Sequence, residues 1–424
     1  MNARRAAEEI FRAGVAAVAP DRLVRLALDR LRLRLAPESN LYVIGAGKSS
    51  AIMAKEVEAE FGERITAGWV VVKYGHACPL ERIKITEAGH PTPDANGFAG
   101  AAEVLQLAQR AGERDLVLCL LSGGGSALLA DCPEGSSPED VAQMNRLLVR
   151  SGADISEINA VRKHLSEIKG GQLARAAQPA RVLSLILSDV IGDPLDVIAS
   201  GPTVPDASTF NDALAVIEKY GLQEEAPQSL LRRLREGAAG WRAETPKPGD
   251  ALFENVQNGI IGNNVIALEA CRKKAASLGF SAQVVTASLS GDSAAAVRQI
   301  LEAAWRASAS TCLIFGGETT LQVTGAGQGG RNQHLALAAD IQLADKPGIT
   351  FLAAGTDGTD GPTDAAGAVV DSATTPSARG GGIDPVHCLK TFDSHPFFRR
   401  AGGHIITGPT LTNVMDIVIV LVER

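Results

Sequence analysis

Glycine-flanked polar turns are the residues of this sequence with the clearest chemical meaning. Each turn comes where an apolar run ends, at residues 45–50, 122–126, 188–193, 316–320 and 355–361. In an open α/β sheet, ligands bind beyond the carboxyl ends of the strands, and glycine lets backbone N–H groups approach an anion closely. Together these turns predict an enzyme that handles phosphate groups.

The first turn combines small residues with a cation. A strand-like run and a helix-like run are joined here by Gly45, Gly47, Lys48 and Ser49. The amide groups and the helix N-terminus would face a phosphate, and Lys48 would add a point charge. The two common phosphate loops do not fit, because position 42 is tyrosine where a Walker A loop needs glycine, and position 50 is serine where the dinucleotide fingerprint needs glycine. A tight turn with a surface lysine is the alternative.

The second turn follows an apolar run and consists of Ser122, Gly123, Gly124, Gly125 and Ser126. Three consecutive glycines are costly in a folded chain, which favours close approach of the backbone to a ligand. A serine-hydrolase elbow around Ser126 is not supported, because leucine replaces the second glycine of the G-x-S-x-G pattern. We therefore interpret this turn as an anion-binding loop.

Cations and an amide lie together on one short stretch that contains Asn159, Arg162 and Lys163. They could hold the carboxylate or phosphate of a substrate, arginine through two parallel hydrogen bonds and lysine as a point charge. The same residues would also be ordinary on the solvated face of a helix. Spacing alone does not separate the two interpretations.

Three carboxylates, Asp189, Asp193 and Asp196, follow the apolar run 182–187. Mg²⁺ binds one or two carboxylates together with phosphate oxygens and water, and an alcohol nucleophile needs an acceptor for its proton. Asp189 lies nearest the strand end and is the candidate base, and Asp193 is the candidate metal ligand. The alternative is that these aspartates cap turns and helix starts. We interpret His90 as a loop or core residue, because the histidines show no metal-ligand spacing.

The C-terminal part of the chain repeats the pattern. Glu318 and Thr319 lie in one glycine-flanked turn, and Asp357 and Asp360 lie in another. Arg331 opens a helix-like run, where the positive helix end favours an anion. We predict that these residues contact a nucleotide or its phosphates, although each turn taken alone has a purely structural alternative.

Short β-rich runs alternate with helix-like segments, which predicts βα units, a mostly parallel sheet and the α/β fold class. Strands are expected at 41–44, 69–72, 116–121, 182–187, 282–286, 312–315, 321–324, 350–354 and 416–422, and helices at 50–61, 95–111, 139–151, 267–278, 293–307 and 332–341. The strands are continuously apolar, which suits a sheet covered by helices on both faces.

A segment rich in Gly, Pro and Lys interrupts this alternation between residues 236 and 259 and has the composition of a connector. We place the domain boundary there, with a doubly wound α/β domain at 1–240 and a smaller α/β domain at 241–424. The alternation resumes at 258–266. One large domain with an insertion is the alternative.

The composition is that of an ordinary globular protein, with 45% apolar and 21% charged residues and a formal net charge of −7. It gives no basic footprint for nucleic acid, and the arginine-rich stretch 22–34 predicts a helix with one solvated face. No apolar run reaches the roughly 18 residues of a membrane span, and the N-terminus lacks a secretory signal. We expect a cytoplasmic protein whose six scattered cysteines are free thiols.

Taken in order, the motifs resemble the glycerate 2-kinase family, whose C-terminal domain is named MOFRL. The resemblance rests on segments spread over almost the whole chain, at 43–49, 89–94, 121–128, 187–193, 198–203, 317–320, 330–333 and 355–361. It implies an N-terminal Rossmann-like domain, a smaller C-terminal domain and an active site in the cleft between them.

The resemblance also implies a reaction, the ATP- and Mg²⁺-dependent transfer of a γ-phosphoryl group to the 2-hydroxyl of D-glycerate, which gives 2-phosphoglycerate. The important lysine, aspartate and arginine of the family match Lys48, Asp189 and Arg331. The oligomeric state stays open between monomer and homodimer. Two alternatives remain: an NAD(P)H-dependent hydroxypyruvate reductase, and a non-catalytic protein that binds nucleotides or sugar acids.

Overall fold

The computed structural model describes residues 2–31, 35–344 and 346–423, and the chain divides into two compact units. The central unit comprises residues 20–261, and the terminal unit comprises residues 1–19 together with 262–424. This division differs from the expected boundary at residue 240 in two respects. Residues 241–261 stay with the central unit because they supply a strand of its sheet, and the first helix of the chain packs in the terminal unit.

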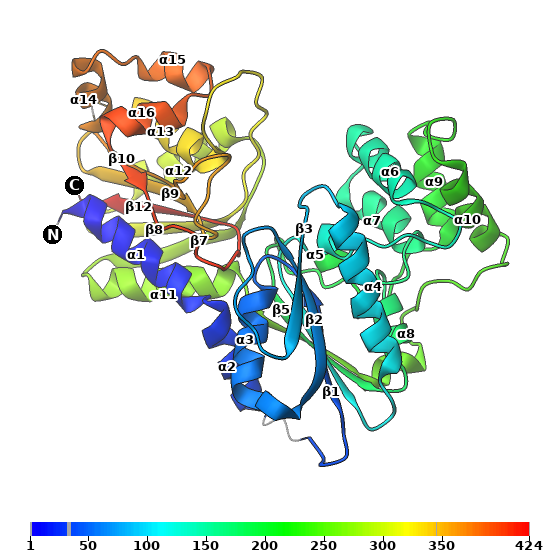
Figure 1. Cartoon of the computed structure of the whole chain (residues 1–424). Coiled ribbons are helices and arrows are strands. Elements are labelled where there is room, and N and C mark those ends of the chain that lie inside the picture. Colours follow the sequence, from blue (N-terminus) through cyan, green and yellow to red (C-terminus); the bar gives the residue numbers. More distant parts are fainter. Residues whose placement is uncertain (1, 32–34, 345, 424) are drawn as a thin grey trace. The chain divides into compact units, whose positions relative to one another are not determined.

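The central unit is built on a six-stranded sheet of order β3-β2-β1-β4-β5-β6 (Figure 1). Its strands are β1 (Leu41–Ala46), β2 (Ile65–Lys73), β3 (Ile83–Ala88), β4 (Leu116–Leu121), β5 (Arg181–Leu187) and β6 (Val256–Gly262). Parallel pairing joins β3, β2, β1, β4 and β5. The predicted doubly wound parallel sheet is confirmed for this unit, and this strand order is the one found in dinucleotide-binding folds.

Helices cover both faces of this sheet, as the continuously apolar strands predict. Ile44 and Cys119 face the core that contains α4 (Ala95–Arg110) and α8 (Gln172–Ala176). Val43 and Leu118, one residue away on the same strands, face the core formed with α2 and α3. The remaining elements around the sheet are α2 (Pro20–Leu31), α3 (Ser50–Phe61), α5 (Gly125–Leu128) and the short 3₁₀ turns η1 (Gly62–Arg64), η2 (Ile198–Ser200) and η3 (Ala251–Asn255).

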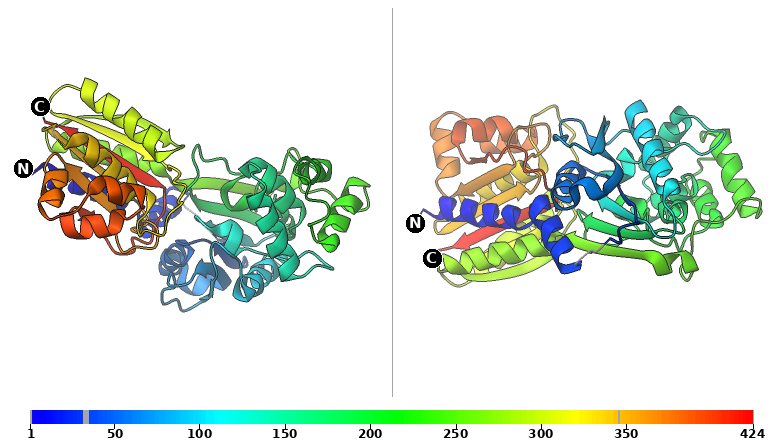
Figure 2. Two further views of the ribbon diagram at one scale, coloured as in Figure 1. Left: turned by 90° about the horizontal axis from the view of Figure 1, so that it is seen from above. Right: turned by 60° about the horizontal axis from the view of Figure 1, so that its bottom comes forward.

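Four further helices of the central unit form an apolar cluster of their own at one end of the unit (Figure 2). They are α6 (Pro138–Arg150), α7 (Ile155–His164), α9 (Phe210–Lys219) and α10 (Gln228–Ala238). The helix α7 begins at a capping box, in which the Asp154 carboxylate accepts from the amide of Glu157 and the Glu157 carboxylate accepts from the amide of Asp154. This cluster fixes α7 beside the sheet.

The terminal unit has a mixed sheet of order β11-β10-β9-β12-β8-β7. Its strands are β7 (Ser281–Leu289), β8 (Thr311–Gly317), β9 (Ile349–Gly355), β10 (Gly367–Asp371), β11 (His404–Ile405) and β12 (Asp416–Val422). The final strand β12 lies between β8 and β9 and is antiparallel to both. The parallel arrangement predicted from the runs up to residue 187 therefore does not extend to this sheet.

Helices also cover both faces of the terminal sheet. The helices α1 and α11 lie side by side on one face, and α12, α13 and α16 belong to the core on the other (Figures 1 and 2). The helices are α1 (Ala3–Ala17), α11 (Asn264–Ser277), α12 (Ser293–Arg306), α13 (Arg331–Leu343), α14 (Thr374–Gly380), α15 (Pro385–Lys390) and α16 (Ser394–Ala401). Two local predictions fail, since residues 321–324 form no strand and the run 258–266 ends β6 and begins α11.

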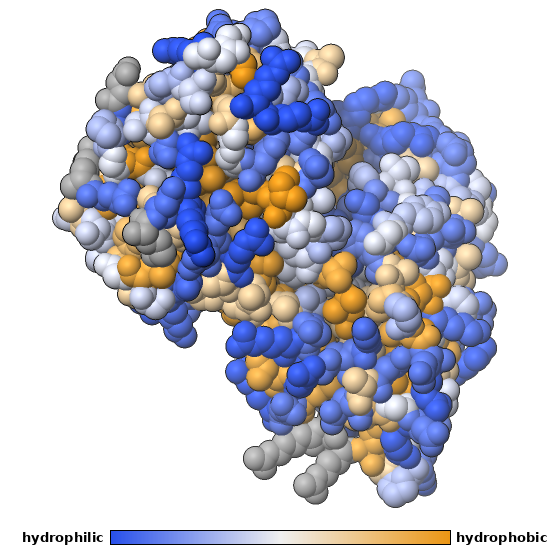
Figure 3. Space-filling model, turned by 60° about the vertical axis from the view of Figure 1, so that its left-hand side comes forward, coloured by the Kyte–Doolittle hydropathy of each residue, from blue (hydrophilic) through white to orange (hydrophobic). Residues whose placement is uncertain are grey.

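Several predictions from composition are confirmed. All six cysteines are free. The arginine-rich stretch is helical as α2 up to Leu31, and residues 32–34 lie outside the described part of the chain. No helix within the described residues has the length and apolar character needed to cross a membrane. On the face drawn in Figure 3, hydrophilic residues predominate and apolar residues form small groups between them.

Candidate functional site

Two polar loops meet at the carboxyl ends of β1 and β4, the neighbouring strands at which the order of the central sheet reverses. This switch point is where open α/β sheets bind their ligands. The loops are joined directly, because the amide of Lys48 donates to the Gly123 carbonyl at 2.9 Å and the amide of Ser49 donates to Ser122 Oγ at 3.0 Å. The sheet thus brings together two of the sequence motifs that are far apart along the chain.

The glycines of the first loop are required by the packing of the protein itself. A Cβ on Gly47, where φ is +140°, would lie 2.1 Å from Ser122 Oγ, and a Cβ on Gly45 would lie 2.1 Å from the Leu120 carbonyl oxygen. The amides of Gly47, Lys48 and Ser49 all donate to acceptors within the protein. We therefore leave the backbone of the first loop out of the phosphate site, in contrast to the expectation from the sequence.

The second loop has amide groups that are open. Among the described residues, no acceptor faces the N–H groups of Gly123 and Gly124. Gly124 adopts φ of +86°, and a Cβ there would come within 2.9 Å of the His90 imidazole, so that only glycine fits. Gly125 packs tightly against Ala199, and its amide donates to the Ser122 carbonyl. Successive open amides in a turn of this kind form a concave anion-binding nest.

Polar side chains surround this nest. Ser49 Oγ is fully buried and has no hydrogen-bond partner among the described residues. Burial and the charges of Lys48, Lys73 and His76 lower the pKa of His90 to about 4, so that His90 is neutral at neutral pH. His90 was interpreted as a loop or core residue because its proximity to Gly124 arises only in the folded sheet.

The stretch that contains Asn159 lies on α7, where its members have different environments. Asn159 is buried, and its Nδ2 has no acceptor among the described residues. Arg162 Nε donates to Asn145 Oδ1 at 2.8 Å, no carboxylate of the described residues pairs with its guanidinium, and burial lowers its pKa. Lys163 instead contacts two carboxylates, Asp206 at 3.3 Å and Asp196 at 3.4 Å, with only 5% of its side chain exposed. Among the described residues, Asn159 Nδ2 and the Arg162 guanidinium thus have no carboxylate partner, whereas Lys163 is paired with two carboxylates.

The acidic segment after β5 is half-buried at Asp189 and Asp193. Asp193 has φ of +55°, a conformation that is uncommon outside glycine and often marks a functional loop. No cluster of three or more metal-ligating side chains occurs within the described residues. A magnesium site that uses one or two carboxylates is compatible with this arrangement.

A separate group of charged residues lies in the terminal unit, at the first turn of α13. Arg331 donates from Nε and Nη2 to the two carboxylate oxygens of Asp416, at 2.6 and 2.9 Å, and its Nη1 lies 2.8 Å from Glu318 Oε1. Burial alone would lower the pKa of Arg331, but the hydrogen bonds and charge of Asp416 and the charge of Glu318 outweigh burial and raise it. The guanidinium is therefore charged and held in one orientation.

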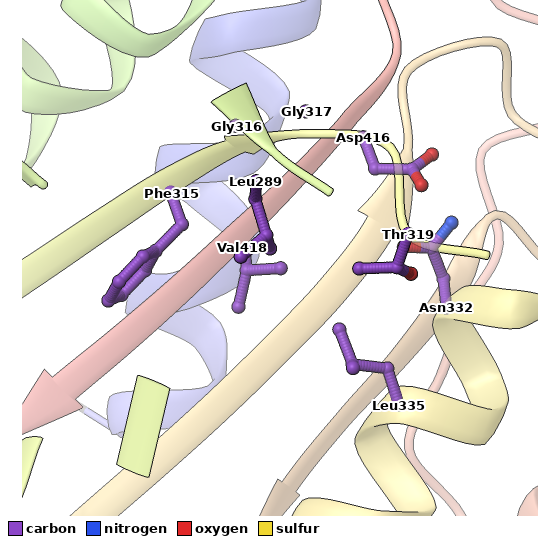
Figure 4. Close-up of a pocket in the computed structure, with 9 residues that line it drawn as sticks. All are labelled: Leu289, Phe315, Gly316, Gly317, Thr319, Asn332, Leu335, Asp416 and Val418. Carbon is purple, nitrogen blue, oxygen red and sulfur yellow. The ribbon is translucent and has the colours of Figure 1, made fainter. Parts of the chain in front are cut away.

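Asp416 could not be selected from the sequence pattern, because it precedes an apolar run, whereas the predicted site residues follow such runs. Asp416 begins β12, and because β12 is antiparallel to its neighbours, Asp416 pairs with Gly317 and Gly355 at the carboxyl ends of β8 and β9. A narrow hollow lies at this edge of the sheet. Figure 4 shows Asp416, Thr319 and Asn332 on one side of it and Phe315, Leu289 and Val418 on the other.

Asp360 has a structural role at the same helix end. Its carboxylate accepts from the amides of Asn332 at 3.0 Å and Gln333 at 2.8 Å, and only 3% of the residue is exposed. Burial raises the pKa of Asp360 to about 6. The positive end of α13 is therefore occupied by Asp360, which we exclude from the nucleotide contacts. Asp357 is half-buried and caps the amide of Thr359.

Two family models match successive parts of the chain. The family model described as "Domain of unknown function (DUF4147)" matches residues 6–235, and the MOFRL family model matches residues 311–416. The D-glycerate 2-kinase of Thermotoga maritima is 43% identical to this chain over 99% of the chain and 98% of the relative. The chain belongs to the glycerate 2-kinase family.

A second relative and a solved structure lead to the same family. The glycerate 2-kinase of Pyrococcus horikoshii is 43% identical over 91% of this chain and 88% of the relative. The crystal structure of glycerate kinase from Thermotoga maritima superposes with a TM-score of 0.90 at 43% identity and covers 99% of both chains. The family resemblance and the two-domain α/β fold expected from the sequence are therefore confirmed.

Proposed function

We propose that this protein transfers the γ-phosphoryl group of ATP to the 2-hydroxyl of D-glycerate and forms 2-phosphoglycerate and ADP. The names and full-length similarity of the relatives support the activity. The observation in this chain that best supports it is the pair of open amides at Gly123 and Gly124, which lies beside Lys48 at the switch point of the sheet. Such a nest suits a phosphate group.

Phosphoryl transfer depends mainly on positioning and on neutralisation of spread negative charge. In our proposal the amides of Gly123 and Gly124, together with the hydroxyl of Ser49, hold phosphate oxygens, whereas the Ser126 hydroxyl contacts Ser200. Lys48 places a positive charge on the transferring group. These roles require no covalent intermediate with the protein.

The acceptor substrate would be held by α7. Asn159 and Arg162 supply hydrogen-bond donors to the carboxylate of D-glycerate, and a guanidinium that lacks a carboxylate partner among the described residues is well suited to that charge. Asp189 accepts the proton of the 2-hydroxyl or orients it for attack. Ser126, Ser200 and Asn159 are joined by hydrogen bonds, so the carboxylate-binding residues are connected directly to the phosphate loop.

Magnesium fits the acidic segment after β5. Asp193 provides a hard oxygen ligand there, and Mg²⁺ commonly uses only one or two carboxylates and completes its shell with phosphate oxygens and water. When bound, the ion would neutralise charge on the phosphates of ATP. Asp193 would hold the ion, and Asp189 would remain the acceptor for the hydroxyl proton.

We further propose that Arg331 of the terminal unit binds a phosphate group of the nucleotide. Glu318, Thr319 and Asp357 are its candidate nucleotide contacts. Glu318 pairs with Arg331, so a phosphate would have to displace that carboxylate from the guanidinium. We propose a cytoplasmic location for the reaction.

A coupled assay tests this proposal. The protein is incubated with D-glycerate and Mg-ATP in the presence of enolase and pyruvate kinase but without phosphoglycerate mutase. Pyruvate is expected, because enolase accepts 2-phosphoglycerate. If pyruvate appears only after the mutase is added, the product is 3-phosphoglycerate and the proposed position of transfer is wrong. Oxidation of NADH on hydroxypyruvate, without ATP turnover, would favour a reductase instead.

A further inference from the structure

A buried amide donor on α7 has no partner in the part of the chain that the structure describes. Asn159 is 3% exposed, and its Oδ1 accepts a hydrogen bond from Ser200 Oγ at 3.0 Å. Within the described residues, no acceptor lies within reach of its Nδ2. A buried donor that is left unsatisfied costs about 1–3 kcal/mol, and native proteins contain few of them. The Asn159 Nδ2 is therefore a donor that a ligand oxygen would satisfy.

The orientation of this amide depends on Ser200. Because the Ser200 hydroxyl donates its only proton to Asn159 Oδ1, it accepts in its 2.8 Å contact with Ser126 Oγ. The order of donation is thus Ser126 to Ser200 to Asn159. An amide without this donor could turn over and exchange its donor and acceptor ends. The two serines therefore define which end of Asn159 is available to a ligand.

The backbone at Ser200 is strained. Ala199 has φ of +52° and Ser200 has φ of +60°, and neither is glycine. Residues held in such conformations cost on the order of 1–3 kcal/mol and persist where the surroundings determine them, often at functional sites. Because of this conformation, the buried Ser200 hydroxyl lies between Ser126 of α5 and Asn159 of α7.

The positive charge of Arg162, close to Asn159 in the sequence, indicates that the ligand is an anion. Arg162 follows Asn159 by three residues, so both lie on the same face of α7. The only polar partner of its guanidinium within the described residues is the amide oxygen of Asn145. An amide donor and an uncompensated guanidinium on one helix face form a site for a carboxylate.

We infer that Ser200, held by Ser126, is a positioning residue that keeps the Asn159 amide donor directed at the carboxylate of a short 2-hydroxy acid. This inference rests on the proposed function, since it assigns the acceptor subsite of that reaction. Ser200 itself does not contact the substrate. Its loss should weaken acceptor binding and leave the nucleotide site unchanged.

Two substitutions of Ser200 distinguish the effect of losing the hydroxyl from the effect of relieving the backbone strain. Both Ser200→Ala and Ser200→Gly remove the donor, but only glycine relieves the strain of positive φ. We expect each variant to raise the KM for D-glycerate about tenfold, as loss of one hydrogen bond to a charged group would. The KM for ATP should stay at the wild-type value.

A matched hydroxyl relay elsewhere in the central unit serves as the control. Ser184 contacts Thr203 at 2.9 Å, and Thr203 donates to Asn258 Oδ1 at 2.6 Å, but the Nδ2 of Asn258 is satisfied by a backbone carbonyl. Thr203→Val removes a hydroxyl from this equivalent chain. Its KM for D-glycerate should not change.

Coupling to Asn159 provides the decisive comparison. In an Asn159→Ala background, Ser200→Ala should raise the KM for D-glycerate less than twofold further, because a positioning residue acts only through its partner. Additive effects would overturn the inference. A wild-type KM for D-glycerate in Ser200→Gly would also overturn it, because the backbone and not the hydroxyl would then be responsible.

A binding experiment keeps the inference independent of turnover. D-Glycerate alone should raise the Tm of the wild-type protein and of Thr203→Val, and should raise that of Ser200→Ala much less at the same concentration. If the wild type forms no 2-phosphoglycerate but still shows this pattern, the proposed reaction fails and the subsite stands. If D-glycerate stabilises Ser200→Ala as strongly as the wild type, the subsite assignment fails.

Discussion

At the scale of single residues, Lys48 is the cation of the first loop, and its amide donates to the Gly123 carbonyl of the loop 122–126. Lys48→Ala should lower kcat by roughly two orders of magnitude, because one positive charge on the transferring group is lost in a site with few alternatives. The coupled pyruvate assay measures this loss. Lys84→Ala, which removes an exposed lysine of β3, should keep the wild-type rate, and an equal loss in both variants would contradict the assigned role of Lys48.

Neighbouring cations on α7 should respond to substitution in opposite ways. Arg162→Met should raise the KM for D-glycerate tenfold or more, with a small change in Tm, because the guanidinium has no carboxylate partner among the described residues to leave unpaired. Lys163→Met should lower the Tm and leave the KM within about twofold, because it strips the buried Asp206 of its counter-ion. Michaelis constants and thermal unfolding of both variants make the comparison. The reverse pattern would restore Lys163 as the substrate ligand.

The ion pairs of Arg331 differ in burial and should therefore differ in energy. Asp416→Asn should destabilise the protein by about 1–3 kcal/mol, because Asp416 is almost fully buried while Arg331 is only partly so. Glu318→Gln should cost less than about 1 kcal/mol, since its side chain is 45% exposed. Chemical denaturation of the two variants tests this order. Equal destabilisation would mean that Asp416 does not hold the guanidinium.

At the scale of elements, Asp340 couples α13 to α14 in a pH-dependent way. Its buried carboxylate accepts from the amide and hydroxyl of Thr375, and burial raises its pKa to about 6. A carboxyl whose folded pKa lies above its unfolded value contributes stability when protonated, and this contribution is lost as pH rises through about 6.

The expected result is a loss of stability of the wild type with rising pH, measured against Asp340→Asn, which does not titrate at this position. The free energy of unfolding of the wild type, relative to that variant, should fall by about 2 kcal/mol between pH 4.5 and pH 7.5. Denaturant titrations of both proteins at the two pH values give the difference. A constant difference, or one that grows with pH, would show that the folded-state pKa of Asp340 is not raised.

The elements that local patterns predict well are those with strong apolar periodicity. The expected bounds of α3, β4 and β12 agree with the structure, and β1, β5 and α4 differ only at their ends. The strand predicted at residues 321–324 was wrong: an apolar residue beside threonine has high β propensity, but within the described residues no strand pairs with this segment. Propensity describes a segment, whereas a strand requires a partner.

The candidate site was predictable where it depends on loops that follow strands and unpredictable where it depends on tertiary contacts. Lys48 and Gly124 could be selected from the sequence alone. The pairing of Arg331 with Asp416 requires the knowledge that β12 is antiparallel, and the strained backbone of Ser200 requires the fold around it. Capping by Asp360 could not be separated from ligand binding, because both use the same residue type in a turn.

At the scale of the whole molecule, the helix α1 belongs to the terminal unit, although the sequence that directly follows it forms the central unit. The helix α1 packs against α11, β9 and β12, and Arg4 binds Asp371 at the end of β10 with distances of 2.6 and 2.7 Å. Periodicity along the chain could not reveal this assignment, since α1 and α11 are separated by the entire central unit.

This assignment predicts which unit a substitution in α1 weakens. Phe11 is fully buried, so Phe11→Ala should cost about 3–5 kcal/mol, and the loss should fall on the terminal unit. Hydrogen exchange should therefore accelerate in α11 and β12 and stay slow in β1 and β4, because protection follows the stability of the unit that contains each amide. Arg12→Ala, at the adjacent exposed position, should leave both sets of amides protected. Faster exchange in β1 and β4, with α11 unaffected, would instead assign α1 to the central unit that directly follows it in sequence.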